Sequence, residues 1–201
     1  MNKQRNLQQK ILKICLFNKR SPVFATLLFL FSYQILVSQS TFLAASAFYD
    51  DSFRNWEVIA LDSLDNEHIE VLELKWPLKN DWTEWKWDTA EQLTYLEQTY
   101  RNNDSRWTYR FYDSPITMQA KWRNDPRIWT ITHGELKVNW KTAYNLPDQW
   151  IYEDKAFGYF EVITTYENDV RDWEIIDESS LPDEVKRSMI FISLYVASPR
   201  Q

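Results

Sequence analysis

Residues with the chemistry for proton transfer are few and far apart in this chain. His68 and His133 are the two histidines, and each has one carboxylate directly beside it, Glu67 and Glu135 respectively. An isolated histidine next to a glutamate is more typical of a surface pair than of a general base. No serine lies in the context of a nucleophile elbow. We therefore predict no catalytic residue and no enzymatic activity, although the many carboxylates leave a glycosidase-type pair open.

Ligands for a cofactor or a metal ion are equally sparse. Gly134 and Gly158 are the two glycines, and they are too far apart to form a phosphate-binding loop. Cys15 is the one cysteine and lies near the N-terminus, so the rest of the chain has no thiolate site and no disulfide. Asn-Asp pairs such as Asn80-Asp81 offer oxygen ligands, but a calcium loop clusters three or more carboxylates. We expect these pairs to form turns, and we predict no cofactor and no metal.

Tryptophan is the residue type whose spacing carries the most information. Six of the eleven tryptophans recur at intervals of 29, 22, 22, 21 and 23 residues. They are Trp56, Trp85, Trp107, Trp129, Trp150 and Trp173. Exposed tryptophan rings could stack on sugars, and Trp82, Trp87 and Trp150 are the candidates for such a platform. Regular recurrence at the starts of strands is more typical of a core, so we expect the six to be a buried structural repeat.

The sequence around these tryptophans indicates six β-hairpins. Each tryptophan follows an Asn- or Asp-containing segment by about four or five residues, and these residue types start turns. Before each turn, apolar and polar residues alternate, as in a sheet that is buried on one face. The residues predicted to face inward are Ile116, Met118, Ala120 and Trp122 in one arm, Leu136, Val138, Trp140 and Tyr144 in the next, and Phe160, Val162 and Tyr166 in the last.

One predicted strand changes phase. Ile69 and Val71 fall on odd-numbered positions, whereas Leu72, Leu74 and Trp76 fall on even-numbered ones, so the two groups point to opposite faces of a regular strand. We expect a β-bulge near Val71 and Leu72, because one extra residue would return all of these apolar side chains to the inward face.

The last part of the chain has a helical pattern. Ser180 is placed to cap a helix whose first turn begins at Leu181, with the acidic Asp183 and Glu184 near its positive end. From Met189 onward the helix is apolar nearly all round, so it must be buried on all sides. We predict a helix at about residues 181–198, with a final β-strand as the alternative.

These elements together predict an all-β fold with one helix. Six antiparallel hairpins give about twelve strands, and a sheet of that size removes its edges by closing into a barrel. Such a barrel is wider than its own side chains can fill, since roughly eight strands is the filled size. A hydrophobic C-terminal helix inside the barrel fills the space. The predicted domain covers residues 41–201.

This arrangement resembles the tubby-like fold, which is shared by tubby C-terminal domains, LURP-one-related proteins and phospholipid scramblases. The resemblance covers residues 41–198 and rests on the hairpin count and on the helix at Val185–Ala197. Tubby domains bind phosphoinositides through basic residues, and this chain has no Lys/Arg cluster in the barrel to carry that function over. The cysteine-rich and proline-rich segments of scramblases are absent as well. The resemblance therefore implies a fold and little function.

Residues 1–40 have the pattern of a targeting leader. Residues 1–20 contain six basic side chains and no acidic one, and residues 21–49 carry no charge, with the most apolar run from Val23 to Val37. This pattern predicts a cleaved signal peptide, or an uncleaved membrane tether through residues 22–40, with the barrel outside the cytoplasmic membrane. Cleavage is expected after Ser40 rather than after Ala47, because the first strand must lie at about residues 41–49.

The charge of the remaining chain limits the classes of partner that it can bind. Residues 21–201 hold 17 basic and 29 acidic side chains, a formal charge of −12, which argues against nucleic acid. We expect a non-catalytic binding or scaffolding barrel whose partner is an unknown protein, lipid or glycan. A membrane-anchored, lipid-associated barrel and a carbohydrate-binding module are the alternatives. One local group of basic residues departs from this acidic balance and forms either a solvated outer face or a patch for an acidic ligand. Its members are Lys121, Arg123, Lys137 and Lys141.

Overall fold

The computed structural model of the protein describes residues 39–48, 52–101, 103–111, 114–167 and 169–199. The predicted leader lies outside these residues except for Gln39 and Ser40, so its role in export or anchoring stays a prediction. Within the described residues, no helix is both long enough and apolar enough to cross a membrane.

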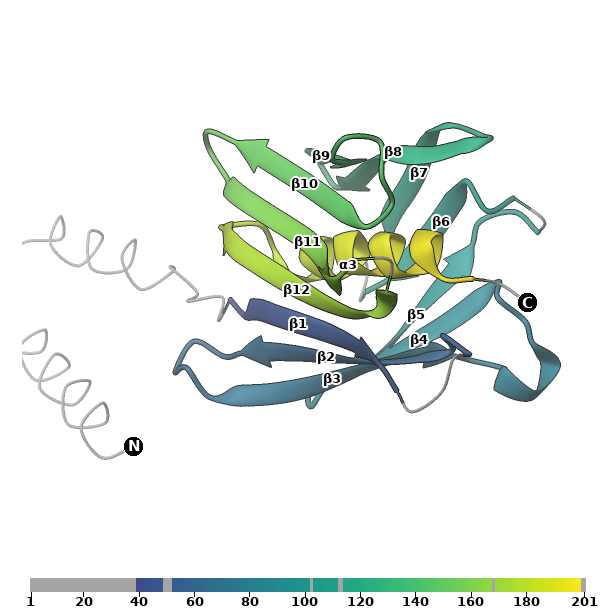
Figure 1. Ribbon diagram of the computed structural model, residues 1–201, viewed down its shortest axis with the longest axis horizontal. Coiled ribbons are helices and arrows are strands. Elements are labelled where there is room, and N and C mark those ends of the chain that lie inside the picture. Colours follow the sequence, from purple (N-terminus) through teal and green to yellow (C-terminus); the bar gives the residue numbers. More distant parts are fainter. Residues whose placement is uncertain (1–38, 49–51, 102, 112–113, 168, 200–201) are drawn as a thin grey trace, which may run out of the picture. The chain divides into compact units, whose positions relative to one another are not determined.

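Twelve antiparallel strands form a closed barrel (Figure 1). Each strand pairs with its neighbours in the sequence, and the first strand pairs with the last. The strands are β1 (Thr41–Ala47), β2 (Asn55–Leu61), β3 (Glu67–Leu74), β4 (Glu84–Asp88), β5 (Leu93–Gln98), β6 (Arg106–Arg110), β7 (Ile116–Trp122), β8 (Asp125–His133), β9 (Leu136–Thr142), β10 (Gln149–Asp154), β11 (Gly158–Tyr166) and β12 (Asp169–Ser179). This topology confirms the predicted barrel of six hairpins, which pair β1 with β2, β3 with β4, and so on to β12.

Every hairpin contains the same tryptophan interaction. The six repeat tryptophans are each at most 1 % exposed, so they belong to the core, as their spacing predicts. Each indole Nε1 donates to the backbone carbonyl three residues earlier, at distances between 2.7 and 3.3 Å. Trp129, for example, donates to the carbonyl of Pro126. The buried indole therefore has its one polar atom satisfied, and the same bond fixes the turn to the core.

The Asn and Asp side chains at these turns bond to the nearby backbone. Oδ1 of Asp81 accepts from the backbone N–H of Thr83, and Oδ1 of Asn103 accepts from that of Ser105. Asp125 makes the same kind of bond two residues ahead. Such bonds stabilise a tight turn locally, which accounts for the recurrence of Asn and Asp before the repeat tryptophans.

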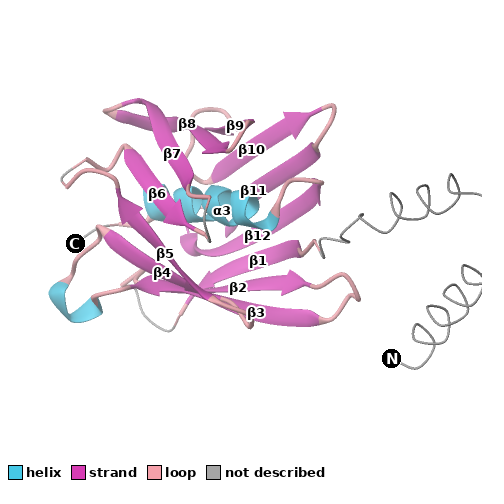
Figure 2. Cartoon of the chain, turned by 180° about the vertical axis from the view of Figure 1, so that it is seen from behind, coloured by secondary structure: helices cyan, strands magenta, loops and turns pink. Residues whose placement is uncertain are grey.

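Helix α3 (Asp183–Ala197) runs through the inside of the barrel, as Figures 1 and 2 show from opposite sides. All of its residues from Val185 to Tyr195 are buried. Near its last turns the Phe191 ring packs edge-on against Trp85 and Trp107, with centroid distances of 6.0 and 4.9 Å. The helix thus supplies the filling that a twelve-stranded barrel needs.

The predicted start of this helix is two residues too early. Residue Pro182 occupies the N-cap position and makes no side-chain capping bond. Ser180 does not cap the helix; its backbone N–H instead donates to the carbonyl of Phe157. The alternative of a final strand is excluded by the helix.

The predicted bulge in β3 is wrong. Strand β3 keeps a regular register with β2, and Ile69 lies on the outer surface with 52 % exposure. The inner positions are filled by Glu70, Leu72 and Leu74, which are all buried. The apolar residues predicted the wrong inward positions because a charged residue, Glu70, occupies one of these positions.

The predicted inward face also fails at the ends of three strands. Trp122, Tyr144 and Tyr166 are 57 %, 86 % and 62 % exposed. Register shifts occur immediately before Trp122 and Tyr166, and Tyr144 has a positive φ of 50°. Both features break the strict alternation of a strand, so each side chain turns outward at the end of the arm.

Strand β1 is required to close the barrel. It pairs with β12 along one edge and with β2 along the other. Loss of residues 41–47 would remove the whole strand and leave two open edges, and cleavage after Ser40 rather than after Ala47 stays a prediction.

Candidate functional site

The two ends of the barrel differ in chemistry, and we name each after the end of α3 that lies there. The N-terminal mouth holds the start of α3 and the connections between successive hairpins. The C-terminal mouth holds the end of α3 and the turn within each hairpin. Both mouths contain polar groups that could bind or react.

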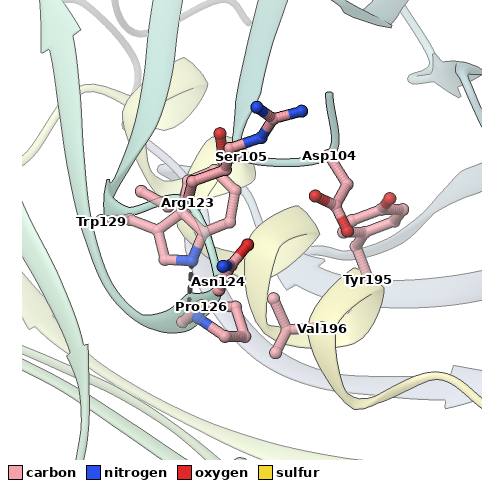
Figure 3. Close-up of a pocket in the computed structure, with 9 residues that line it drawn as sticks. Asp104, Ser105, Arg123, Asn124, Pro126, Trp129, Tyr195 and Val196 are labelled. Carbon is pink, nitrogen blue, oxygen red and sulfur yellow. Dashed lines mark hydrogen bonds between the residues drawn. The ribbon is translucent and has the colours of Figure 1, made fainter. Parts of the chain in front are cut away.

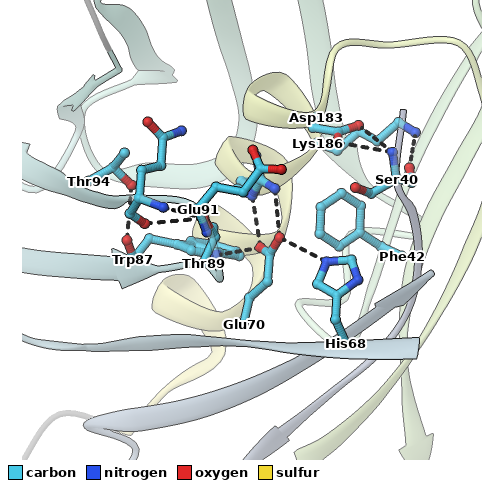
Figure 4. Close-up of polar contacts among 12 residues, drawn as sticks. Ser40, Phe42, His68, Glu70, Trp87, Thr89, Glu91, Thr94, Asp183 and Lys186 are labelled. Atoms are coloured by element: carbon cyan, nitrogen blue, oxygen red, sulfur yellow. Dashed lines mark hydrogen bonds and ion pairs between the residues drawn. The ribbon is translucent and has the colours of Figure 1, made fainter. Parts of the chain in front are cut away.

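A buried ion pair lies just inside the N-terminal mouth. Arg187 of α3 donates through Nε and Nη2 to the two carboxylate oxygens of Glu70, at 2.8 and 2.6 Å. The indole of Trp87 donates to the same carboxylate at 2.7 Å, and His68 Nε2 lies 3.4 Å from it (Figure 4). Burial alone disfavours the charged guanidinium, but the hydrogen bonds and charge of Glu70 outweigh it and hold the pKa of Arg187 above its usual value.

A neutral hydroxyl pair extends this cluster. The Tyr109 hydroxyl lies 3.0 Å from that of Thr94, and the Tyr109 side chain is fully buried. Burial raises the pKa of Tyr109 to about 12, so this phenol stays protonated at neutral pH. Glu70 and Arg187 are bonded to each other and shielded from solvent, so this pair ties β3 to the helix, whereas Tyr109 ties β6 to β5 through Thr94.

A second buried pair joins the chain entry to the helix. Lys186 Nζ donates to Asp177 at 2.8 Å and to the backbone carbonyl of Ser40 at 3.0 Å. The backbone N–H of Ser40 lies 3.0 Å from both carboxylate oxygens of Asp183 (Figure 4). Burial raises the pKa of Asp183, against the lowering effect of the Ser40 bonds. These contacts fix where the chain enters the barrel.

The two histidines do not pair with the adjacent carboxylates. His68 lies beside Glu70, and His133 Nδ1 lies 3.4 Å from Glu184 of the helix. Both are partly buried at the N-terminal mouth, with side chains 27 % and 22 % exposed. The surface pairs with Glu67 and Glu135 that the sequence suggested are therefore wrong. Among the described residues, no group of three or more His, Cys, Asp or Glu side chains is placed to hold a metal ion.

A cavity of about 200 Å³ opens at the C-terminal mouth (Figure 3). Its inner wall consists of Trp129 together with Tyr195 and Val196 from the last turn of α3. Side chains from the β5–β6 and β7–β8 turns surround its opening. They are Asp104, Ser105, Arg123 and Asn124. The cavity thus combines an aromatic floor with a carboxylate, a hydroxyl, a guanidinium and an amide, a set that both donates and accepts hydrogen bonds.

Large apolar side chains surround the same mouth on the outside. Of the fourteen large hydrophobic residues that are exposed in the described part of the chain, eight lie at its turns, and every one of the six hairpins contributes at least one. They are Phe48, Trp76, Leu78, Tyr100, Trp122, Tyr144, Leu146 and Tyr166. The connections at the opposite mouth contribute only Leu64 among the described residues. We call these eight residues the apolar rim.

Polar atoms without partners are concentrated at this mouth as well. Among the described residues, five buried side-chain atoms have no hydrogen-bond partner, and all five belong to residues at or next to the hairpin turns. They are Arg54 Nε, Asn55 Oδ1, Gln98 Oε1, Arg106 Nε and Asp148 Oδ1. Buried polar atoms are normally paired, so their gathering at one end marks that end as unusual.

The structure changes the list of candidate sugar-binding residues. Trp87 and Trp150 are fully buried, so neither can form a sugar-binding platform. Trp82 is partly buried, packs edge-on against Trp85, and donates its indole N–H to Asn80. Among the described residues, the exposed aromatic side chains belong to the apolar rim, apart from Tyr95 on the outer face of β5, which is 38 % exposed.

The predicted group of four basic residues is exposed, and one of its members lines the cavity. Lys121, Lys137 and Lys141 all lie on the outer surface of β7 and β9. Arg123 follows β7 and lines the cavity opening.

A signal for the apolar rim is present in the sequence. Trp76, Tyr100, Trp122, Tyr144 and Tyr166 recur at intervals of 24, 22, 22 and 22 residues. Each precedes a repeat tryptophan by six to nine residues. Four members of this second repeat were assigned to the inward face because they continue the alternation of their strands, and Tyr100 was assigned to neither face. The four are Trp76, Trp122, Tyr144 and Tyr166.

Comparison with known proteins adds no relative. No protein-family model matches the chain, and neither does any curated protein or any solved structure.

Proposed function

We propose that the protein is a non-catalytic binding module that acts outside the cytoplasmic membrane and takes its ligand at the C-terminal mouth. The observation that carries this proposal is the apolar rim, in which all six hairpins place a large apolar side chain in solvent at one mouth of the barrel. Exposed apolar groups gathered in one place mark interaction surfaces, whereas scattered ones need no explanation. Tyrosine and tryptophan are also the residues most enriched at binding hot spots.

The placement of the titratable groups supports binding over catalysis. The histidines and the Glu70–Arg187 pair lie at the N-terminal mouth, away from the cavity, and the ion pair is bonded within the protein. The cavity itself contains a carboxylate and a guanidinium but no histidine, cysteine or lysine. Such a lining suits recognition by hydrogen bonds better than proton transfer at neutral pH.

The entry point of the chain fits a presented binding surface. Gln39 and Ser40 lie at the N-terminal mouth, where Gln39 donates to the carbonyl of Leu181 and Ser40 donates to Asp183. A tether through residues 22–40 would join the barrel at this end. The C-terminal mouth would then be free of the attachment point and available to a partner.

The test compares the apolar rim with an equally apolar control surface. The full chain, labelled with a fluorophore, is mixed with envelope material from the cells that produce it, and bound protein is measured after sedimentation. Replacing Tyr100, Trp122 and Tyr144 with serine is expected to reduce binding at least tenfold. Replacing Leu93, Tyr95 and Ile176, which are exposed on the outer faces of strands, serves as the control. Equal binding by both triple variants would contradict the proposal.

One observation favours a lipid-associated barrel as the second candidate. Leu78 is fully exposed at the tip of the short helical turn η1 (Pro77–Lys79), next to Trp76, which is 42 % exposed. Lys79 Nζ lies 4.7 Å from the centre of the Trp76 ring. A leucine tip with an interfacial tryptophan and lysine suits contact with lipid headgroups, and the tubby-like resemblance points the same way. Flotation with neutral and anionic liposomes, wild type against Leu78→Ser, decides this candidate.

A further inference from the structure

We infer that the barrel binds a second copy of itself side by side, through a basic face on strands β6 to β9 and an acidic face on β12. This inference goes beyond the proposed function, because neither face includes a member of the apolar rim. It is carried by three observations: basic side chains without carboxylate partners on one wall, acidic side chains without basic partners on another wall, and a matching spacing in the two sets.

The outer surface of β6 to β9 carries basic side chains and no acidic one. Its outward positions, which alternate with buried ones, hold the basic residues Arg106, Arg110, Lys121, Lys137 and Lys141. Arg110 is paired with Glu97, whereas the other four make no salt bridge within the described residues. We call these four residues the basic face. Protein surfaces usually intersperse both signs of charge, so a wall with one sign is suited to a partner of the opposite sign.

The members of the basic face are too far apart to bind one small anion together. Lys137 and Lys141 lie four positions apart on β9, which separates their Cα atoms by about 13 Å at the usual rise of a strand. Lys141 pairs with Ile128 of β8, and Lys121 lies on the next strand, β7. Two strand spacings therefore separate Lys121 from Lys141, roughly 10 Å. A partner has to present several negative charges at similar separations.

The outer surface of β12 presents charges of the opposite sign. Asp172, Glu174 and Glu178 occupy outward positions there, and none of them makes a salt bridge within the part of the chain that the structure describes. The neighbouring strands β1 and β11 contain no basic side chain. We call these three residues the acidic face.

One copy cannot bring its two faces together. In the closed barrel, β10 and β11 separate β12 from β9, and β1 to β5 separate it from β6 (Figure 1). The two faces thus belong to different walls of a barrel whose interior is filled by α3. The carboxylates that the basic face lacks in its own copy are therefore available to it from a second copy.

The two faces match in spacing as well as in sign. Glu174 and Glu178 lie four positions apart on β12, as Lys137 and Lys141 do on β9. When the two strands lie alongside each other, both ion pairs form together. Each copy contributes a different face to the contact, so a further copy can add on either side, and the assembly grows as a row or closes into a ring.

The borders of the basic face disfavour a long polyanion as the partner. Glu97 on β5 and Glu153 on β10 point outward on its two sides. A nucleic acid or another extended polyanion would reach over these carboxylates and be repelled by them. The acidic face is one strand wide, so it can contact the basic face without reaching either border.

The experiment exchanges the charges of the two faces. Binding between two differently labelled pools of the full chain is measured in a neutral detergent, at about 50 and 500 mM salt, because exposed ion pairs are weak and are screened by salt. One variant carries Lys137→Glu with Lys141→Glu, and the other carries Glu174→Lys with Glu178→Lys. We expect the wild type to bind itself at low salt and high salt to weaken this binding at least tenfold. Each variant should lose at least tenfold in binding to itself, whereas a mixture of the two variants should recover binding, because it brings opposite charges together again.

A matched control separates the faces from the overall charge. Glu67→Lys with Asp88→Lys changes the net charge as much as the reversal on β12 does, at outward positions of β3 and β4, and should bind as the wild type does. Association through the shared leader would add equally to every combination. If the reversal on β9 prevents cooperative unfolding in urea, Lys137→Gln with Lys141→Gln replaces it and should weaken binding in the same direction.

Three results would overturn the inference: no binding by the wild type at low salt, equal binding by the reversal variants, or no recovery in their mixture. If the reversal on β9 reduces binding to envelope material while the wild type does not bind itself, the basic face belongs to a different acidic partner. None of these results bears on the apolar rim, so the proposed function stands or fails on its own test.

Discussion

Replacing either member of the Glu70–Arg187 pair should destabilise the barrel far more than replacing both. The carboxylate of Glu70 is 1 % exposed and the side chain of Arg187 is 9 % exposed, so neither charge has access to bulk water. The perturbation consists of Glu70→Gln, Arg187→Met and the double variant. Glutamine keeps an oxygen that can accept from Trp87, and methionine fills most of the volume of the arginine side chain.

The magnitude follows from what each variant leaves unpaired. Removing one partner of a buried ion pair costs about 3–5 kcal/mol, because the other charge stays buried without its counterion. If the two single effects simply added, the double variant would lose roughly 6–10 kcal/mol. The double variant instead contains no buried charge from this pair, and its main defect is an amide donor without an acceptor, which costs about 1–3 kcal/mol.

Urea unfolding followed by tryptophan fluorescence measures these differences, and the double-mutant cycle gives the coupling between the two residues. The matched control is the exposed pair of Arg110 and Glu97, with side chains 64 % and 34 % exposed, where Arg110→Met should cost less than about 1 kcal/mol. Additive effects of Glu70→Gln and Arg187→Met would show that Glu70 does not face the helix and would refute the inward placement of this strand position.

Two further predictions concern local features of the barrel. The pKa of Tyr109 is about 12, whereas an unfolded tyrosine ionises near pH 10, so the folded state retains a proton that the unfolded state has lost and stability falls as pH rises through this window. Tyr109→Phe should remove this pH dependence, which amounts to about 1.4 kcal/mol in the free energy of unfolding per pH unit. Urea unfolding of both proteins at about pH 9 and 11 measures the difference. Gly158→Ala would place a Cβ 2.3 Å from the carbonyl oxygen of Glu178, whereas Gly134→Ala meets open space. Both glycines have positive φ, so each alanine costs about 1–2 kcal/mol, and thermal unfolding should show a clearly larger loss for Gly158→Ala.

The hairpins and the helix could be predicted because their signals are local. A turn, a repeat tryptophan and an alternating arm all fall within about 22 residues, and the chain repeats them six times. The helix was predictable for a different reason. A segment that is apolar on every face has to be surrounded, and only the interior of the barrel offers such surroundings.

The charged interior could not be predicted from spacing. Glu70 and Arg187 are 117 residues apart, and neither residue type suggests burial without its partner. Because inward positions were assigned from apolar residues alone, the predicted inward face of β3 was wrong at Ile69 and Glu70. The apolar rim was missed for the opposite reason, since Trp122 and Tyr166 continue the alternation of their strands and only the register shift before each of them turns the side chain outward.

The helix inside the barrel also decides where a ligand can bind. Because α3 fills the interior, the barrel has no room for a ligand there, and the proposed binding surface lies on turns that the packed core beneath them keeps in place. A single exposed aromatic ring contributes little binding free energy. Side chains anchored on a rigid frame lose little conformational entropy on binding, so little of that contribution is offset. The same hairpin that buries one tryptophan exposes a second large apolar side chain a few residues earlier. Repeating it six times therefore builds the core and the apolar rim together, which explains why the two aromatic repeats share nearly the same period.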